Sequence, residues 1–285
     1  MVIKKEDLTH EKIFTDIRQV YQEHYGTSDT RLVERVFNDI IDLFQGKKRG
    51  FQKCDTQYHD LFHTLQVAPP FIGILDGWNK SGNIPHITKY YFDLGLVSVL
   101  LHDTGYIKKD GDSRGTGGKY TFVHIQRSID FAEHYLPQIG FDEQQIQSVR
   151  NIIMCTGVRV DYSQLHFRAD EERVIGYALG TSDLIGQMSA ADYPEKLSAL
   201  FDEFEEAYRF EGKEKLKTMG AIIFESLDDL TRSTPRFYEA VVKDKFQKMG
   251  SLDACLSYHA KDRHNPYLEA IEENIQKIKL AASLA

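Results

Sequence analysis

Apolar residues recur every three or four positions along most of the chain, the spacing that places side chains on one face of an α-helix. No Asn-Gly or Asp-Gly turn joins two alternating segments, so hairpin strands are not indicated. The sequence therefore predicts an all-α fold. The expected helices run from a cap at Asp7 or Thr9 to about 24, from a cap at Ser28 or Asp29 to Gly46, and over about 58–68, 71–77, 86–106, 121–137, 142–156, 171–190 and 194–211, with several more in the remainder.

Proline and glycine positions divide these helices. Pro69 and Pro70 are expected to end the helix that starts near Tyr58. Residues 108–119 contain four glycines and no apolar residue, which predicts a flexible loop. Its Lys108, Lys109, Arg114 and Lys119 are candidates for contacting an anionic group, the alternative being a solvated loop. No Pro/Ser-rich linker interrupts the chain, which favours one helical domain with a C-terminal extension.

Composition narrows the class of protein. Hydrophobic residues make up 41% and charged residues 27% of the 285 positions, so a folded globular chain is expected. The formal net charge of −8 argues against binding a nucleic-acid duplex. The longest apolar run, Leu94–Leu101, is too short to span a bilayer, and no secretory leader is recognisable. Three scattered cysteines suggest free thiols, so a cytoplasmic location is expected.

Two histidine patterns stand out among eleven histidines. His59 and His63 are four positions apart, so a helix would place them on one face, as a ligand pair or as an ordinary surface pair. His102 and Asp103 end the most apolar predicted helix. A carboxylate at the end of a buried helix needs a partner or a metal ion, unless that terminus reaches solvent.

A second acidic residue lies within an apolar helix. Asp183 falls midway through the segment 171–190, and as a buried acid it would need a cation, unless it belongs to an exposed polar face with Ser182 and Gln187. Imidazole nitrogen combined with carboxylate oxygen suits borderline to hard divalent ions. Gln187, one turn later, is a candidate to bond a base or sugar, or is simply solvated.

Taken in order, these motifs resemble those of the HD superfamily of metal-dependent phosphohydrolases, most closely its cyclic-nucleotide phosphodiesterase-like branch. Tyr58–His63 is similar to that branch's Tyr-His-Asn-x-x-His, Leu100–Tyr106 to its His-Asp motif, and Ser182–Leu184 to its distal aspartate. The resemblance implies a multi-helix HD-domain bundle. It also implies that one or two divalent ions (Mg, Mn, Fe or Zn) bind, the first through His63, His102, Asp103 and Asp183, with Asp103 bridging to the second.

The resemblance also assigns catalytic roles. His59 matches the general acid that protonates the leaving oxygen, and His124 matches a histidine that the family places at the site. The metal ions would activate a water for attack on phosphorus. The chain departs from the branch at Tyr106, where a histidine is usual, and residues 153–157 offer no further histidine ligand.

The expected function is therefore metal-dependent hydrolysis of a phosphate ester or phosphodiester, such as a nucleotide. The alternative is a metal-stabilised, non-catalytic binding or regulatory HD-domain protein. The partner in the first case is a small molecule, with neither a nucleic-acid duplex nor a membrane. The expected division is N-terminal helices over 1–50, the HD core over 51–190, and C-terminal helices packing on the core over 191–285.

Overall fold

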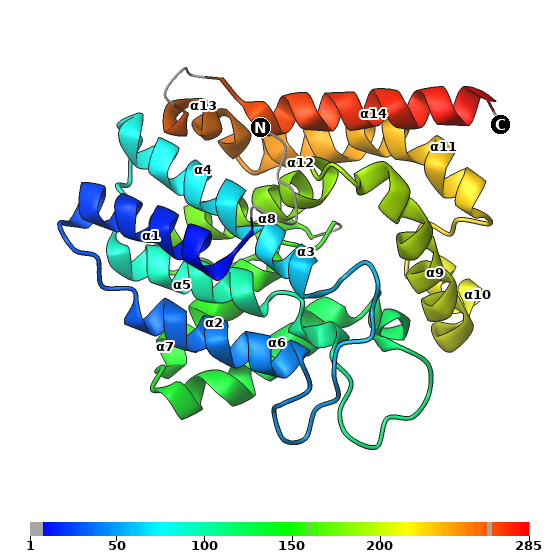
Figure 1. The fold of residues 1–285 in the computed structure, drawn as a ribbon, viewed down its shortest axis with the longest axis horizontal. Helices are drawn as coiled ribbons and strands as arrows, with labels where there is room; N and C mark the ends of the chain where they lie inside the picture. The colour runs from blue at the N-terminus through cyan, green and yellow to red at the C-terminus, as the bar shows by residue number, and fades with distance from the viewer. Residues whose placement is uncertain (1–7, 159, 261–263, 285) are drawn as a thin grey trace.

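The fold is all-α, as a computed structural model of the chain shows (Figure 1). It describes residues 8–158, 160–260 and 264–284, and no β-strand occurs within these ranges. The α-helices are α1 (His10–Tyr25), α2 (Arg31–Phe44), α3 (Leu61–Gln66), α4 (Ala68–Lys80), α5 (Lys89–Leu101), α6 (His124–Tyr135), α7 (Glu143–Met154), α8 (Asp170–Met188), α9 (Tyr193–Glu211), α10 (Lys213–Thr218), α11 (Leu227–Phe237), α12 (Lys243–Lys248), α13 (Leu256–His259) and α14 (Pro266–Leu284).

Shorter turns connect them. The 3₁₀ segments are η2 (Thr104–Tyr106), η3 (Gly117–Tyr120), η4 (Leu136–Ile139), η5 (Tyr162–Gln164) and η7 (Leu252–Cys255), and η6 (Tyr238–Val242) is a π-helical turn. The η2 turn follows α5 directly, and η3 lies just before α6, so both fall in the part of the chain that carries the sequence motifs.

The centre of the fold is the second half of α5. Its residues 94–101 are all buried, and it packs against α2, α7 and α8. Gly95 permits close contact there, because a Cβ at this position would lie 2.4 Å from the Phe71 ring and 2.8 Å from Ile175. The crowded position explains why a glycine interrupts the most apolar helix of the chain. α5 therefore ends deep inside the molecule.

Helix boundaries differ from the sequence expectation at Pro69–Pro70 and at the start of α2, whereas one of the two expected caps of α1 is observed. Pro69 and Pro70 do not end a helix but lie in the first turn of α4, where a missing N–H is tolerated because first-turn amides have no partner within the helix. α2 begins after Thr30 rather than after Ser28 or Asp29. Thr9 caps α1 by accepting from the Lys12 backbone N–H, whereas the alternative cap Asp7 lies outside the described residues.

The C-terminal helices cover one side of α4 and α8. α13 packs on α4, and α14 runs along the top of Figure 1 in contact with α8, α9 and α11. α9 and α10 extend down the right of the same view, where α9 packs against η3. This arrangement brings residues from the last third of the chain next to the motif-bearing segments.

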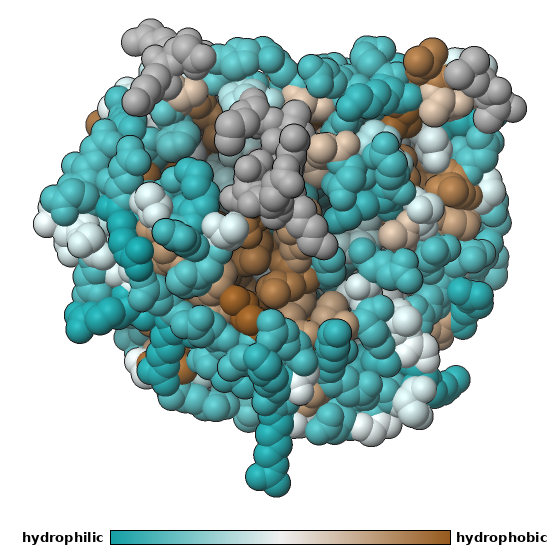
Figure 2. All heavy atoms as spheres, viewed as in Figure 1, coloured by the Kyte–Doolittle hydropathy of each residue, from teal (hydrophilic) through white to brown (hydrophobic). Residues whose placement is uncertain are grey.

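The surface is largely polar. Figure 2 shows one face covered mostly by hydrophilic residues, with hydrophobic ones gathered near its centre. None of the helices in the described ranges is both long enough and apolar enough to cross a membrane.

Candidate metal centre and active site

His59 and His63 come from the segment that leads into α3, where two short-range hydrogen bonds set the local fold. Thr56 Oγ1 donates to the carbonyl oxygen of His59 at 2.6 Å, and Asp60 caps α3 by accepting from the His63 backbone N–H at 2.8 Å. The prediction that both histidines lie on one helix is wrong, because α3 begins only at Leu61. The backbone of Asp60 between them is extended, and the two imidazole rings still lie close together, with centroids 5.1 Å apart.

His102 and Asp103 follow the last residue of α5, so the buried end of that helix presents them to the interior. Their side chains are 1% and 2% exposed, which excludes the alternative of a helix terminus in solvent. His102 Nδ1 donates to the carbonyl oxygen of Val99 at 2.7 Å. This bond fixes the ring so that Nε2 faces the site with its lone pair when the imidazole is neutral.

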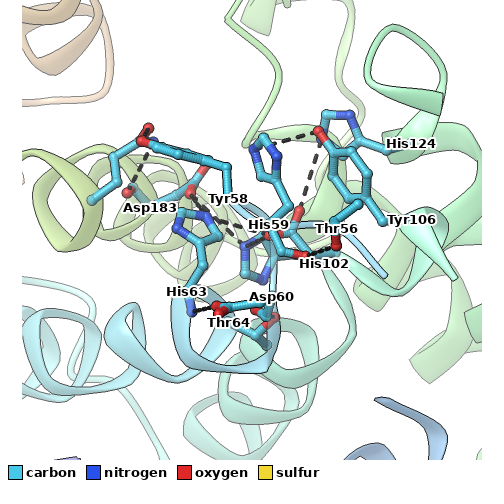
Figure 3. A network of polar contacts seen from close by, with 12 residues as sticks. Thr56, Tyr58, His59, Asp60, His63, Thr64, His102, Tyr106, His124 and Asp183 are labelled. Carbon is cyan, nitrogen blue, oxygen red and sulfur yellow. Dashed lines mark hydrogen bonds and ion pairs between the residues drawn. The ribbon is translucent and has the colours of Figure 1, made fainter. Parts of the chain in front are cut away.

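Four predicted ligand residues converge from three parts of the chain, and Figure 3 labels three of them, His63, His102 and Asp183. Asp103 Oδ2 lies 3.3 Å from both His63 Nε2 and His102 Nε2. Asp183, on α8, places Oδ1 3.5 Å from His63 Nε2 and 3.8 Å from His102 Nε2. In the described part of the chain, His63, His102 and Asp103 form a group whose donor atoms all lie within 4.8 Å of one another.

The donor atoms fit a divalent cation. His102 Nε2 and Asp103 Oδ2 are both buried, and neither has a hydrogen-bond partner among the described residues. Leaving two such atoms unsatisfied next to each other is unfavourable, since each has lost its contact with water. An ion between them would satisfy both, and two imidazole nitrogens with two carboxylates form a donor set that Zn, Fe or Mn accepts.

Burial and neighbouring charges shift the pKa values of Asp103 and His102. Burial alone would raise the pKa of Asp103, but the charges of His102, His63 and His59 outweigh it and hold that pKa far below its usual range. Burial also lowers the pKa of His102, yet the charge of the Asp103 carboxylate, 3.3 Å away, raises it to about 9. A metal ion would have to displace this proton, so metal binding is expected to weaken as the pH falls.

His124, at the start of α6, lies in the same pocket. Its Nδ1 donates to the carbonyl oxygen of Thr121 at 2.6 Å, and its Nε2 faces Asp103 Oδ1 at 3.9 Å. Burial is the main reason that the pKa of His124 is lowered. The side chain is 20% exposed, so it lines the entrance rather than the floor of the site.

Glu203 is a site residue that the sequence analysis did not identify. It lies on α9, is 4% exposed, and its Oε2 lies 2.6 Å from His59 Nδ1. Its Oε1 accepts from the backbone N–H groups of Tyr58 and His59 at 2.8 and 3.3 Å. Burial lowers the pKa of His59, but the charge and hydrogen bond of Glu203 outweigh that effect and raise it. In sequence Glu203 is one of several acids on a helix, with nothing to distinguish it.

Two further side chains in the site have roles other than those expected. Gln187 is not a free ligand for a base or sugar, because its Oε1 accepts from the Tyr58 hydroxyl at 2.9 Å. Tyr106 is 1% exposed, and its ring stacks against the rings of both His59 and His124, whose centroids lie 6.0 Å apart. The tyrosine at this position therefore belongs to the site itself.

Two of the four cationic side chains of the glycine-rich loop over residues 108–119 form ion pairs with aspartates of the protein. Lys108 Nζ lies 2.7 Å from Asp55 Oδ2, and Lys119 Nζ lies 2.5 Å from Asp112 Oδ1. Both lysines are buried, and η3 at the end of the loop packs against α9. The ion pairs of these two lysines therefore hold the loop in place, and neither lysine is free to bind a phosphate.

Comparison with known proteins gives a fold relationship. The phosphodiesterase domain of the Salpingoeca rosetta rhodopsin phosphodiesterase superposes with a TM-score of 0.57 at 15% identity, over 99% of this chain and 91% of that one. A second structure, the phosphodiesterase domain of the RhoPDE fusion protein from the same choanoflagellate, gives 0.58 at 15% identity, over 99% and 92%. At this identity the likeness concerns the fold, and it agrees with the predicted all-α class.

Sequence comparison adds less. A protein-family model described as Npun_R2479-like matches residues 113–254, a range that includes His124, Asp183 and Glu203 but not the motifs around His63 and His102. No curated protein sequence matches the chain.

Proposed function

We propose that the chain is an HD-type, metal-dependent phosphohydrolase that cleaves a phosphate ester or phosphodiester of a small molecule, such as a nucleotide. The observation that carries this proposal is the convergence of His63, His102, Asp103 and Asp183, with two of their buried donor atoms unsatisfied. The likeness to phosphodiesterase domains supports it at the level of fold.

The four side chains would bind the ion, and His59 would donate a proton to the leaving group. A divalent ion at this place supplies charge stabilisation to the phosphoryl oxygens and lowers the pKa of a nearby water. His59 is suited to be the general acid, because the charge and hydrogen bond of Glu203 raise its pKa and so favour the protonated imidazole, and its side chain is 14% exposed. Glu203 holds Nδ1, which leaves Nε2 as the atom that donates to the leaving oxygen.

The position of His59 favours an enzyme over the alternative, a metal-stabilised protein that turns over nothing. A structural ion needs no proton donor beside it, whereas ester cleavage with a poor leaving group does. His124, whose Nε2 faces Asp103, is proposed to support substrate or a second ion next to that carboxylate. One or two ions are therefore compatible with the proposal.

The proposed division of the chain keeps residues 1–50, 51–190 and 191–285 as N-terminal helices, core and C-terminal helices. His63, His102, Asp103 and Asp183 all belong to 51–190. Glu203, which contacts His59, comes from 191–285. The C-terminal part would thus complete the site in addition to packing on the core.

The experiment compares His59→Ala and Asp103→Ala on an alkyl and a nitrophenyl phosphodiester, with metal content measured in parallel. His59→Ala should keep the metal and lose about 10²–10⁴ in turnover on the alkyl ester, but less on the nitrophenyl ester, whose leaving group departs without a proton. Asp103→Ala should lose metal and activity together. The exposed His134→Ala is the matched control and should behave as the wild type.

Two results would overturn the proposal. Absence of hydrolysis by the metal-loaded wild type across a panel of phosphodiesters and nucleotides would favour the non-catalytic alternative. Loss of metal from the His59 variant would mean that this residue is a ligand and not the acid.

A further inference from the structure

The turn that carries His102 and Asp103 is bonded from one side by α6. Ser128, on that helix, is 0% exposed, and its hydroxyl is shared between two backbone groups of the turn. The hydroxyl donates to the carbonyl oxygen of His102 at 2.5 Å and accepts from the backbone N–H of Gly105 at 2.8 Å. One side chain therefore links both ends of the segment 102–105, with Asp103 between them.

Arg127, the preceding residue of α6, bonds the next part of the same turn. Its Nε donates to the carbonyl oxygen of Gly105 at 2.6 Å, and its Nη2 donates to that of Ile107 at 3.0 Å. The guanidinium carbon also lies 3.5 Å from the ring centroid of Tyr120. Tyr120 comes directly after the glycine-rich loop, so the end of that loop also supports the turn.

Gly105 allows the turn to lie directly against the first residues of α6. A Cβ at this position would lie 2.0 Å from the carbonyl oxygen of His124 and 2.9 Å from the backbone nitrogen of Ser128. Both distances are shorter than a van der Waals contact, so only glycine fits here. The close approach keeps the Ser128 hydroxyl within reach of the turn, and it places His124 next to Asp103.

The direction of two proposed donor atoms depends on the backbone of this turn. His102 and Asp103 are adjacent in sequence, yet Nε2 of the first and Oδ2 of the second lie 3.3 Å apart. Adjacent side chains of a regular helix point about 100° apart, so this convergence depends on how the chain turns at the end of α5. Groups that fix the orientation of metal ligands add to metal affinity, because a loose ligand would have to be ordered when the ion binds.

We propose that Ser128 is a positioning residue for the metal centre. By bonding His102 and Gly105, it fixes the turn in the shape that directs Nε2 of His102 and Oδ2 of Asp103 at one ion. The proposal rests on the function proposed above, because it needs a divalent ion at these side chains. In this role Ser128 acts through the backbone of the turn and is not itself a ligand.

The test measures the affinity of the full chain for Mn²⁺, from the loss of the electron paramagnetic resonance signal of the free ion during a titration. Ser128→Ala should raise the dissociation constant about 10–100-fold, the usual effect of removing a group that orients a metal ligand. The number of ions bound at saturation should stay the same, since all four proposed ligands remain. This readout does not depend on turnover.

Ser98→Ala is the matched control. Ser98 is also 0% exposed, but its hydroxyl donates to the carbonyl oxygen of Leu94 within α5. Both variants remove one buried serine hydroxyl, so urea unfolding is measured for both. Only Ser128→Ala should lose affinity for Mn²⁺, and this comparison separates positioning of the ligands from a general weakening of the fold.

Ser128→Cys is a second variant at the same position, for the case that Ser128→Ala does not fold. A thiol occupies similar space but is a weak donor and a weak acceptor, so the dissociation constant should rise about fivefold or more, the scale of one net hydrogen bond. Wild-type affinity in the Ser128 variants, or an equal loss in Ser98→Ala, would overturn the role of Ser128. A wild type that binds no Mn²⁺ would overturn the metal centre itself, and with it the proposed function.

Discussion

At the scale of single residues, the contact between His59 and Glu203 joins positions 144 apart in the chain and holds the histidine that we propose as the proton donor. Glu203→Gln keeps the size of the side chain and removes the charge that raises the pKa of His59. The alkaline limb of the kcat/KM profile, where the acid loses its proton, should therefore move to lower pH. The profile is measured on an alkyl phosphodiester.

The neighbouring Glu205→Gln serves as the control for this prediction, because Glu205 is on the same helix but exposed. It should leave the profile where it is. If Glu203→Gln leaves the alkaline limb in place while lowering the rate, Glu203 acts through structure and not through its charge.

The four proposed metal-binding residues could be singled out from the sequence because each is unusual in its local context. His63, His102 and Asp103 belong to short local motifs, and Asp183 is an acid in an apolar helix, so each is unusual where it stands. Glu203 and Tyr106 have no such signal. Glu203 is one of several acidic residues in its helix, and an aromatic residue such as Tyr106 is common after a buried helix. Their importance arises only when separate segments meet.

At the scale of elements, Asp76 joins three helices. This fully buried carboxylate on α4 lies 2.7 Å from His24 Nε2 on α1, 2.6 Å from His259 Nδ1 on α13 and 2.8 Å from Lys80 Nζ. Burial would raise the pKa of Asp76, but its three hydrogen-bonded partners outweigh that effect and hold it well below the usual range. Asp76→Asn should lower the free energy of unfolding by about 3–5 kcal/mol at pH 7.

The pH dependence of this effect has a definite sign. A carboxylate with a lowered pKa in the folded state stabilises the fold fully above its unfolded pKa, near about 4, and loses that contribution as the pH falls further. The difference between wild type and Asp76→Asn in urea unfolding should therefore shrink between about pH 4 and pH 2. A difference that stays constant over this range would show that packing, and not charge, is responsible.

Element boundaries were harder to predict than element types. The helices over 142–156, 171–190 and 194–211 agree closely with α7, α8 and α9 because long periodic patterns are robust. The sequence prediction for the start of α4 is wrong because of Pro69 and Pro70. Proline is tolerated in the first turn of a helix as well as after its last turn, so two prolines that indicate a helix stop can belong to a helix start. The buried lysines of the glycine-rich loop depend on Asp55 and Asp112, which local composition does not reveal as partners.

At the scale of the whole molecule, α14 stabilises the end of the helix that carries Asp183. The buried amide of Asn274 donates to the carbonyl oxygens of Met188, the last residue of α8, at 2.9 Å and of Ala190 at 2.7 Å. Asn274→Ala should leave both carbonyls without this donor and lower the free energy of unfolding by about 1–3 kcal/mol. Chemical denaturation measures the change.

Ser283→Ala is the control for Asn274→Ala, because Ser283 is exposed on the same helix and bonds only within it. It should change stability by less than about 0.5 kcal/mol. Equal stability of wild type and Asn274→Ala would mean that α14 contributes nothing to the end of α8. The sequence predicted C-terminal helices that pack on the core, but not which side chains make the contact, because contacts across 80 or more positions leave no local pattern.

The central claim is that His63, His102, Asp103 and Asp183 bind one divalent ion. The most direct measurement is anomalous diffraction from crystals of the full chain grown with Mn²⁺. The strongest anomalous peak should lie within about 2.0–2.3 Å of Nε2 of both histidines and of a carboxylate oxygen of both aspartates. A peak at other side chains, or full manganese loading with no density among these four, would contradict the account.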